Sequence, residues 1–152
     1  MQAGTVQHGE VALGVGGAKF ASKPDMGEPN TQNSGSDAQS MALKVDTCLG
    51  TVKVLHVHAA HDIGRAVNPT QVEGQIHGGV ARGLGLALME EYISGRTDNL
   101  HDYLIPTIGD IPPITTHLVE DPEPVAPYGA KGVGEPALIA TAPAIYGAIR
   151  QA

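Results

Sequence analysis

The 152-residue chain is the size of one domain, and its formal net charge of -7 argues against nucleic acid or an anionic membrane as its partner. A single cysteine, Cys48, excludes an internal disulfide and cannot hold an iron–sulfur cluster alone. No apolar run approaches the ~18 residues of a membrane span, and the N-terminus lacks the basic and apolar regions of a signal peptide. We therefore expect a cytoplasmic, reduced protein, in which 20 glycines and 11 prolines produce many loops.

The N-terminal segment, residues 1–40, is predicted to be poorly defined and rich in loops. A short β-prone run begins at Glu10 and is interrupted by glycines, whereas residues 21–40 contain almost no apolar side chain. Such a composition is typical of a mobile loop. The character of the sequence changes at Met41, so residues 41–152 form the better-defined part of the chain.

Residues 41–61 are predicted to form a β-hairpin with its turn at Gly50. Apolar side chains recur along both halves, at positions 43, 45, 52, 54 and 57. Three histidines, His56, His58 and His61, lie close together in the second half, and imidazole is a good zinc ligand. No cysteine or carboxylate completes a ligand set at a familiar spacing, so we expect no metal held by protein side chains here.

A long glycine-rich helix is predicted over residues 69–92. Asn68 is a good N-cap, Pro69 suits the first helical position, and Gln71 falls at the capping-box position. An apolar stripe then recurs every four residues, at positions 72, 76, 80, 84 and 88. This stripe predicts that one side of the helix packs against a core.

Five glycines interrupt this helix, at positions 74, 78, 79, 83 and 85, and each costs up to ~1 kcal/mol relative to alanine. At about 100° per residue, Gly78, Gly79 and Gly85 lie opposite the apolar stripe, on the side that carries Gln75. Such a smooth face predicts that another backbone or a flat ligand lies against it. Tight packing of the helix against a sheet explains the glycines equally well.

The remaining segments predict the other elements of the fold. After a polar turn at residues 94–99, residues 114–120 predict a strand and residues 121–127 an extended, proline-stiffened segment. A last helix begins at Thr141. The predicted fold class is α+β: a mostly antiparallel sheet with a long glycine-rich helix and a C-terminal helix.

One loop, residues 128–136, reads YGAKGVGEP and is the most informative segment of the chain. Three glycines and a proline frame Lys131 and Glu135, so the backbone can turn tightly and approach a ligand closely. A lone carboxylate in such a frame is a candidate general base. We call this segment the glutamate loop.

The glutamate loop resembles the active-site glutamate loop of the molybdenum hydroxylases, the xanthine dehydrogenase and aldehyde oxidoreductase family. The helix entry at residues 61–85 is similar to that of the family's molybdopterin-binding subunit, and shorter matches follow in the family's order at residues 102–107, 119–124 and 143–145. The resemblance covers residues 41–152 and corresponds to the C-terminal part of a much longer subunit. It implies a fragment of a larger molybdopterin-binding domain, as a separately encoded small subunit or a truncated gene product.

The resemblance implies a molybdenum pterin cofactor, as Mo-molybdopterin or its dinucleotide form, with iron–sulfur clusters and FAD only on partner domains. In that family a Mo-bound hydroxide attacks an electron-poor carbon of a heterocycle or an aldehyde after a glutamate removes its proton. Glu135 matches this base, and Gln75 matches the glutamine whose amide contacts the pterin. The backbone N–H groups of Gly132, Val133 and Gly134 are then expected to face cofactor oxygens.

The resemblance also gives a role to the smooth helix face and to the loop lysine. Gly78 and Gly79 are expected to lie against the cofactor, and Lys131 to favour the ionised form of Glu135. Each assignment has a plainer alternative: Glu135 as a surface carboxylate, Gln75 as a solvent-facing helix residue, and Lys131 as a solvated cation.

Two charged residues beside Gly64 are expected to have a structural role. Asp62 and Arg65 flank this glycine at the turn before the long helix, and they are expected to fix the turn by pairing rather than to touch substrate.

The implied partners are the remaining molybdopterin-binding polypeptide, iron–sulfur and flavin subunits, and a small-molecule substrate. The substrate-pocket segments and the iron–sulfur cysteines are missing from this sequence, so the chain alone is expected to be inactive. The alternative function is a non-catalytic structural remnant or assembly module of such a complex.

Overall fold

The computed structural model describes residues 11–18 and 36–152 and shows an α+β fold, as predicted. A four-stranded sheet has the strand order β1-β2-β3-β4, formed by Val11–Ala18, Asp37–Asp46, Thr51–Asp62 and Ile114–Val119. The mobile loop predicted for residues 21–40 lies mostly outside the described residues. Within them, β2 begins at Asp37, ahead of the predicted start of the hairpin at Met41.

The sheet is mostly antiparallel, which confirms the prediction. β1 pairs with β2 and β2 with β3 in antiparallel register, whereas β4 runs parallel to β3. The parallel pair follows from the connection between β3 and β4, because the chain passes through the long helix α1 before it returns to the sheet.

The predicted hairpin is formed by β2 and β3, and its turn is held by one carboxylate. Asp46 Oδ1 accepts hydrogen bonds from the N–H groups of Cys48 and Leu49, and Gly50 adopts a φ of 67°. Further along, Leu43 pairs with Val54 whereas Ala42 pairs with His56, so Leu55 is an extra residue in β3. This bulge explains why apolar positions 54 and 57 are three residues apart and are both buried.

The glycine-rich helix α1 spans Pro69–Leu88, so the predicted end near Tyr92 was wrong. Its start is as expected, because Asn68 Oδ1 accepts a hydrogen bond from the Gln71 N–H at 3.2 Å. At the other end, the N–H groups of Met89 and Glu90 both donate to the carbonyl of Gly85 at 2.9 Å. This shared acceptor closes the last turn, and the chain then leaves the helix axis.

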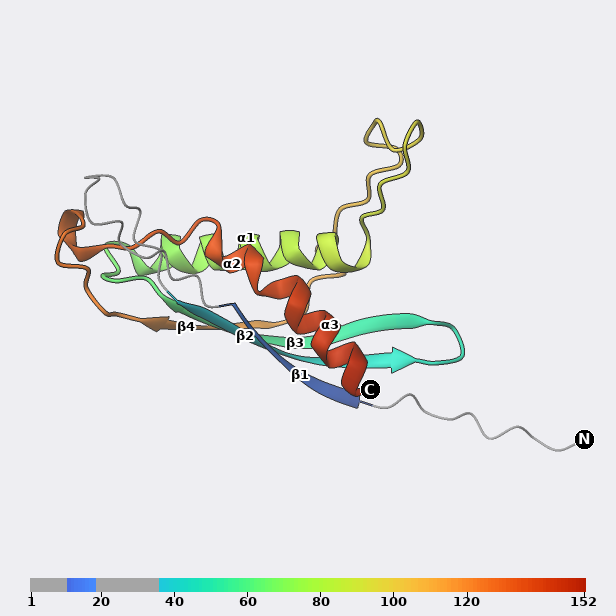
Figure 1. Ribbon diagram of the computed structural model, residues 1–152, viewed down its shortest axis with the longest axis horizontal. Helices are drawn as coiled ribbons and strands as arrows, with labels where there is room; N and C mark the ends of the chain where they lie inside the picture. Colours follow the sequence, from blue (N-terminus) through green and yellow to red (C-terminus); the bar gives the residue numbers. More distant parts are fainter. Residues whose placement is uncertain (1–10, 19–35) are drawn as a thin grey trace, which may run out of the picture.

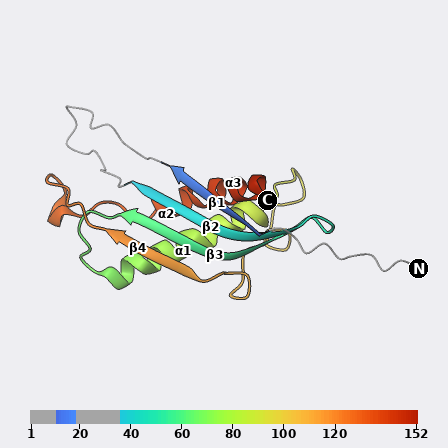
Figure 2. The ribbon, with the colours of Figure 1, turned by 90° about the horizontal axis from the view of Figure 1, so that it is seen from below.

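All helices lie on one face of the sheet. A short 3-10 helix η1 (Pro127–Gly129) leads into the glutamate loop, and α2 (Pro136–Ile139) and α3 (Thr141–Gln151) follow it. The predicted C-terminal helix is therefore confirmed, with α2 as an additional turn before it. Figures 1 and 2 show α1 and α3 stacked against the same side of the sheet, and no helix of residues 11–18 and 36–152 lies on the opposite side.

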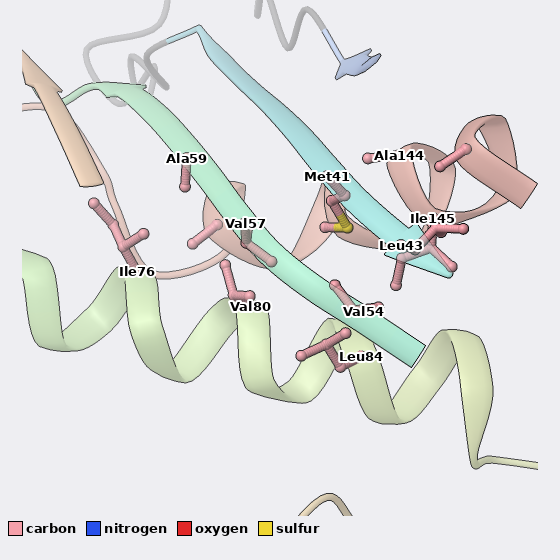
Figure 3. Packing of buried hydrophobic residues seen from close by; sticks show 12 residues of the cluster. Met41, Leu43, Val54, Val57, Ala59, Ile76, Val80, Leu84, Ala144 and Ile145 are labelled. Atoms are coloured by element: carbon pink, nitrogen blue, oxygen red, sulfur yellow. The ribbon is translucent and has the colours of Figure 1, made fainter. Parts of the chain in front are cut away.

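The core lies between the sheet and these helices. In Figure 3, Val80 and Leu84 of α1 lie beneath Val57 and Val54 of β3, and Ile145 of α3 lies beside the strand β2. Each fully buried aliphatic side chain of this kind contributes about 1.5–3 kcal/mol relative to an exposed one. The apolar stripe predicted for α1 thus faces the sheet and holds the helix in place.

Candidate functional site

The turn between β3 and α1 holds the start of the glutamate loop. Gly64 has a φ of 66° and forms an isolated antiparallel bridge with Ala130, and the Lys131 N–H donates to the Ile63 carbonyl at 2.9 Å. A Cβ at Gly64 would collide with the Gly129 carbonyl. Glycine at this position therefore permits both the left-handed turn and the close approach of the loop.

Lys131 is held by two carboxylates at this end of the loop. Its Nζ lies 2.6 Å from Asp62 Oδ2 and 3.4 Å from Asp121 Oδ2, and its side chain is nearly buried. The hydrogen bond that Lys131 donates to Asp62, which is the largest cause, and the charges of both carboxylates raise the pKa of Lys131 above its usual value. Asp62 Oδ1 also accepts the Gly64 N–H at 3.0 Å, so Asp62 ties the turn to the loop while Arg65 remains exposed.

The far end of the loop is held by a buried polar network that sequence reasoning missed. Gln39 Nε2 donates to the Ala137 carbonyl at 2.7 Å, and Gln39 Oε1 accepts from Thr141 Oγ1 at 2.9 Å. Gln39 and Thr141 are both buried. Gln39 falls in the segment predicted to be a loop, and the only signal for its role is its place at one of the alternating, inward positions of β2.

Glycines of α1 let α2 and α3 lie directly against this helix. A Cβ at Gly79 would collide with Ala137, and a Cβ at Gly83 would collide with Thr141. Gly85 similarly makes room for Pro106. Close packing within the chain therefore explains these three glycines. It also places Ala137, the first residue after the glutamate loop, against α1.

Between its two anchoring residues, Lys131 and Ala137, the glutamate loop is largely exposed to solvent. Gly132, Gly134 and Glu135 are exposed, and Val133 is half-buried. Among residues 11–18 and 36–152, no group accepts a hydrogen bond from the backbone N–H of Val133, Gly134 or Glu135. Backbone N–H groups of this kind can donate to a ligand, and Glu135 lies at the N-terminal end of α2.

A groove of about 740 Å³ lies between the start of α1 and the glutamate loop. It brings together three of the predicted cofactor-binding residues, Gln75, Lys131 and Val133, which come from segments far apart in the sequence. Its lining residues are Ile63, Arg65, Val67, Asn68, Gln71, Val72, Gly74, Gln75, Ala130, Lys131 and Val133. Gly132 is not part of this lining, and Gly134 and Glu135 lie beyond Val133, further along the loop.

Two of the α1 glycines, Gly74 and Gly78, have open space where a side chain would lie. A Cβ built at Gly74 or at Gly78 would meet nothing within 4 Å. Gly74 and Gly78 are one turn apart and flank Gln75, which is itself exposed. The helix thus presents an amide between two positions without side chains, whereas the neighbouring Gly79 faces α2.

A second feature missed from the sequence is a buried pair of ionisable residues. Asp37 and His61 are register partners in β2 and β3, and neither side chain has a hydrogen-bond partner among the described residues. Burial raises the pKa of Asp37 to about 6 and lowers the pKa of His61 to about 4. Both lie on the helix-covered face of the sheet.

The three histidines of β3 do not converge. His61 is buried on the helix-covered face, whereas the rings of His56 and His58 pack together with centroids 4.5 Å apart and are more exposed. His56 Nε2 lies 2.9 Å from Thr115 Oγ1, so it is engaged with β4. The three rings therefore cannot share one metal ion.

With this geometry in place, comparisons with known proteins identify the family. The family model described as the molybdopterin cofactor-binding domain matches residues 5–112. The chain belongs to this family. The family resemblance of the sequence is thereby confirmed, and the matched range begins ahead of the glycine-rich helix and includes most of residues 1–40.

Individual relatives agree with this assignment. The xanthine dehydrogenase molybdenum-binding subunit of Escherichia coli O157:H7 is 43% identical over 116 residues, which cover 72% of this chain and 15% of the relative. The nicotine 6-hydroxylase large subunit of Paenarthrobacter nicotinovorans is 35% identical over 141 residues, covering 90% of this chain and 17% of the relative. The chain thus spans only a small part of the length of these relatives.

The fold is also similar to part of a solved oxidoreductase structure. The structure of quinoline 2-oxidoreductase from Pseudomonas putida 86 matches with a TM-score of 0.73 and 36% identity, over 77% of this chain and 16% of that one. In the part of the chain that the structure describes, no helix is long and apolar enough to cross a bilayer.

The displayed residues fit a polar, planar cofactor. The groove has a size typical of ligand sites, and its helical wall presents the Gln75 amide beside the bare position Gly74. An amide both donates and accepts hydrogen bonds, which suits the polar edge of a pterin. The N–H groups of Val133 and Gly134, which have no acceptor among residues 11–18 and 36–152, add donors for anionic or carbonyl oxygens.

Proposed function

We propose that this chain forms part of the cofactor wall of a molybdenum-dependent hydroxylase that oxidises a heterocycle or an aldehyde at an electron-poor carbon. Glu135 is the base, and Gln75 contacts the pterin. The observation that carries the proposal is the loop itself, which is anchored through Lys131 and Ala137 and leaves Glu135 exposed between the anchors.

The helix α1 and the glutamate loop each contribute residues to the proposed site. Gln75 and the bare position Gly78 of α1 form the flat side of the cofactor site, whereas Gly79 sets the distance between α1 and α2. The backbone N–H groups of Gly132, Val133 and Gly134 orient cofactor oxygens. Lys131 positions the loop through Asp62 and does not itself need to reach the cofactor.

The molybdenum pterin cofactor, when bound, supplies the two-electron oxidation of the substrate carbon. Glu135 accepts a proton at its carboxylate during this oxidation, and the two anchors of the loop determine where that carboxylate lies. The remaining parts of the catalytic machinery belong to the remaining molybdopterin-binding polypeptide and to iron–sulfur and flavin subunits.

Replacing the proposed base tests this function. In the holo-complex, Glu135→Gln keeps the shape and hydrogen-bonding ability of the side chain but cannot accept a proton. Removal of a general base typically lowers the rate by ~10²–10⁴-fold. We therefore expect turnover to fall to that extent, while the molybdenum content, measured by metal analysis, stays the same because other contacts hold the cofactor.

The two measurements separate the alternatives. A Glu135→Gln complex that turns over normally would show that Glu135 is not the base. A complex that loses its molybdenum as well would make Glu135 a structural anchor of the loop. The alternative of a non-catalytic assembly module predicts that no variant of this loop changes turnover.

A further inference from the structure

The chain between α1 and β4 forms an arm, residues 90–110, that projects from the C-terminal end of α1 away from the sheet (Figure 1). Many of its side chains are apolar yet exposed to solvent. Leu100 is 83% exposed and Ile108 is 97% exposed. The full set of large exposed apolar residues is Tyr92, Ile93, Leu100, Tyr103, Leu104, Ile105 and Ile108. A concentration of this kind is typical of a surface that another protein covers.

Local polar contacts hold the shape of the arm without burying its apolar side chains. The Tyr103 hydroxyl donates to Glu90 Oε1 at 2.8 Å, which links the two sides of the arm near its base. The Ile93 N–H donates to Thr97 Oγ1 at 2.8 Å and closes a turn at the tip side. The arm is therefore ordered in advance, which lowers the entropic cost of binding.

An apolar groove of about 670 Å³ lies at the base of the arm. The returning part of the arm crosses α1 at Gly85, where the missing side chain makes room for Pro106. Leu84, Leu88 and Ile111 also line this groove, and Leu88 is partly exposed. A partner that binds the arm can thus continue into the groove.

The arm is acidic as well as apolar, and this negative charge limits which protein surfaces can bind it. It contains a single cation, Arg96, whose Nε lies 3.9 Å from Asp102. Its acidic residues are Glu90, Glu91, Asp98, Asp102 and Asp110. A complementary surface therefore carries Lys or Arg around an apolar centre. A second copy of this chain, with its own charge of -7, is electrostatically disfavoured.

We propose that the arm docks this chain onto the remaining molybdopterin-binding polypeptide, which offers an apolar groove with a basic rim. The identity of the partner rests on the proposed function. The match to the family extends through residue 112 and so includes the whole arm, while this chain spans only 15% of the E. coli relative. The polypeptide that accompanies this segment in the relatives is therefore available to cover the arm.

Site-specific photo-crosslinking tests the docking. The affinity-tagged full chain, expressed in the cells that encode it, carries benzoylphenylalanine in place of Leu100 or Ile108. The matched control carries it in place of Leu49, which is 75% exposed at the tip of the β2–β3 hairpin. We expect peptides of a polypeptide with the remaining molybdopterin-binding sequence to be linked from the arm positions and not from position 49.

Other patterns of linkage overturn the proposal. Cross-links from the arm only to a second copy of this chain, only to an iron–sulfur or flavin subunit, or to no protein would each show that the arm docks elsewhere or not at all.

A substitution measures how much the arm contributes. Leu100→Asp combined with Ile108→Asp is expected to lower the recovered partner at least about tenfold, because buried apolar anchors dominate interface affinity. Leu49→Asp should leave recovery unchanged, and circular dichroism should show that all variants fold. Unchanged recovery of the partner by the double variant would overturn the docking role.

The docking role and the proposed function fail separately. Normal docking with normal turnover of Glu135→Gln would remove the function of the base and leave the arm assignment intact. Loss of turnover in Glu135→Gln with undiminished docking by the arm variant would do the reverse.

Discussion

Single residues beneath the helices determine how stability depends on pH. Asp37 is 5% exposed and has a folded-state pKa of about 6, raised from 3.8 by burial. Its contribution to stability is therefore present below pH 4 and is lost as the pH rises through 6. We predict that Asp37→Asn increases the free energy of unfolding by about 1–3 kcal/mol at pH 8 and changes it little at pH 4.

His61 provides the opposite control for this prediction. Its folded-state pKa of about 4 lies below the usual 6.5, so its contribution is present above pH 6.5 and is lost as the pH falls through 4. His61→Gln should therefore reduce acid destabilisation without a gain at pH 8. Urea unfolding of each variant at both pH values measures this, and an equal gain for Asp37→Asn at pH 4 and pH 8 would contradict the assignment.

At the scale of elements, the glycines of α1 serve two different purposes. A Cβ at Gly83 would collide with Thr141, whereas a Cβ at Gly78 would meet open space. We predict that Gly83→Ala lowers the free energy of unfolding by about 1–3 kcal/mol, because the added methyl group overpacks the α1–α3 contact. Gly78→Ala should instead raise it by up to ~1 kcal/mol, as alanine does in an open helix.

Thermal unfolding of the two variants beside the unchanged chain decides this prediction. Opposite shifts of the unfolding midpoint are expected, since the two substitutions are identical in chemistry and differ only in surroundings. Shifts of the same sign would mean that helix propensity alone governs both positions and that α3 does not press on Gly83.

In the part of the chain that the structure describes, helices cover the sheet on one side only. The helices lie on one face of the sheet, and the arm exposes its apolar side chains to solvent (Figure 1). We predict that the isolated chain is oligomeric or poorly soluble, because exposed apolar side chains associate non-specifically when no partner covers them, although the charge of -7 disfavours a specific dimer through the arm. Size-exclusion chromatography with light scattering measures this. A stable monomer with well-dispersed amide NMR signals would contradict it.

Much of the fold could be predicted from local patterns. The hairpin around Gly50, the helix start at Asn68 and the strand at residues 114–119 each follow from turn, capping or alternation signals within a few residues. The end of α1 could not, because apolar residues continue to Ile93 and belong to the arm rather than to the helix. The parallel pairing of β4 likewise depends on the path of the chain between distant segments.

For the candidate site, too, some features could be predicted from the sequence and others could not. Glu135 and Gln75 stand out in the sequence because their glycine-rich surroundings and their resemblance to a known family are local properties of the chain. Their positions also rely on Gln39, which bonds across 98 residues to Ala137, and on the Lys131–Asp62 pair, which spans 69 residues. A hydrogen bond or an ion pair between such distant residues leaves no periodic signal.

The family, the element types and the candidate base follow from the amino-acid sequence alone, since each rests on neighbouring residues and on the conformations that glycine, proline and asparagine favour. Only the tertiary structure decided which glycines of α1 serve packing and which face open space. The same structure shows that Asp37 and His61 are buried together and that the arm exposes its apolar side chains to solvent. These properties depend on which segments exclude water from one another, and that is settled only when the whole chain has folded.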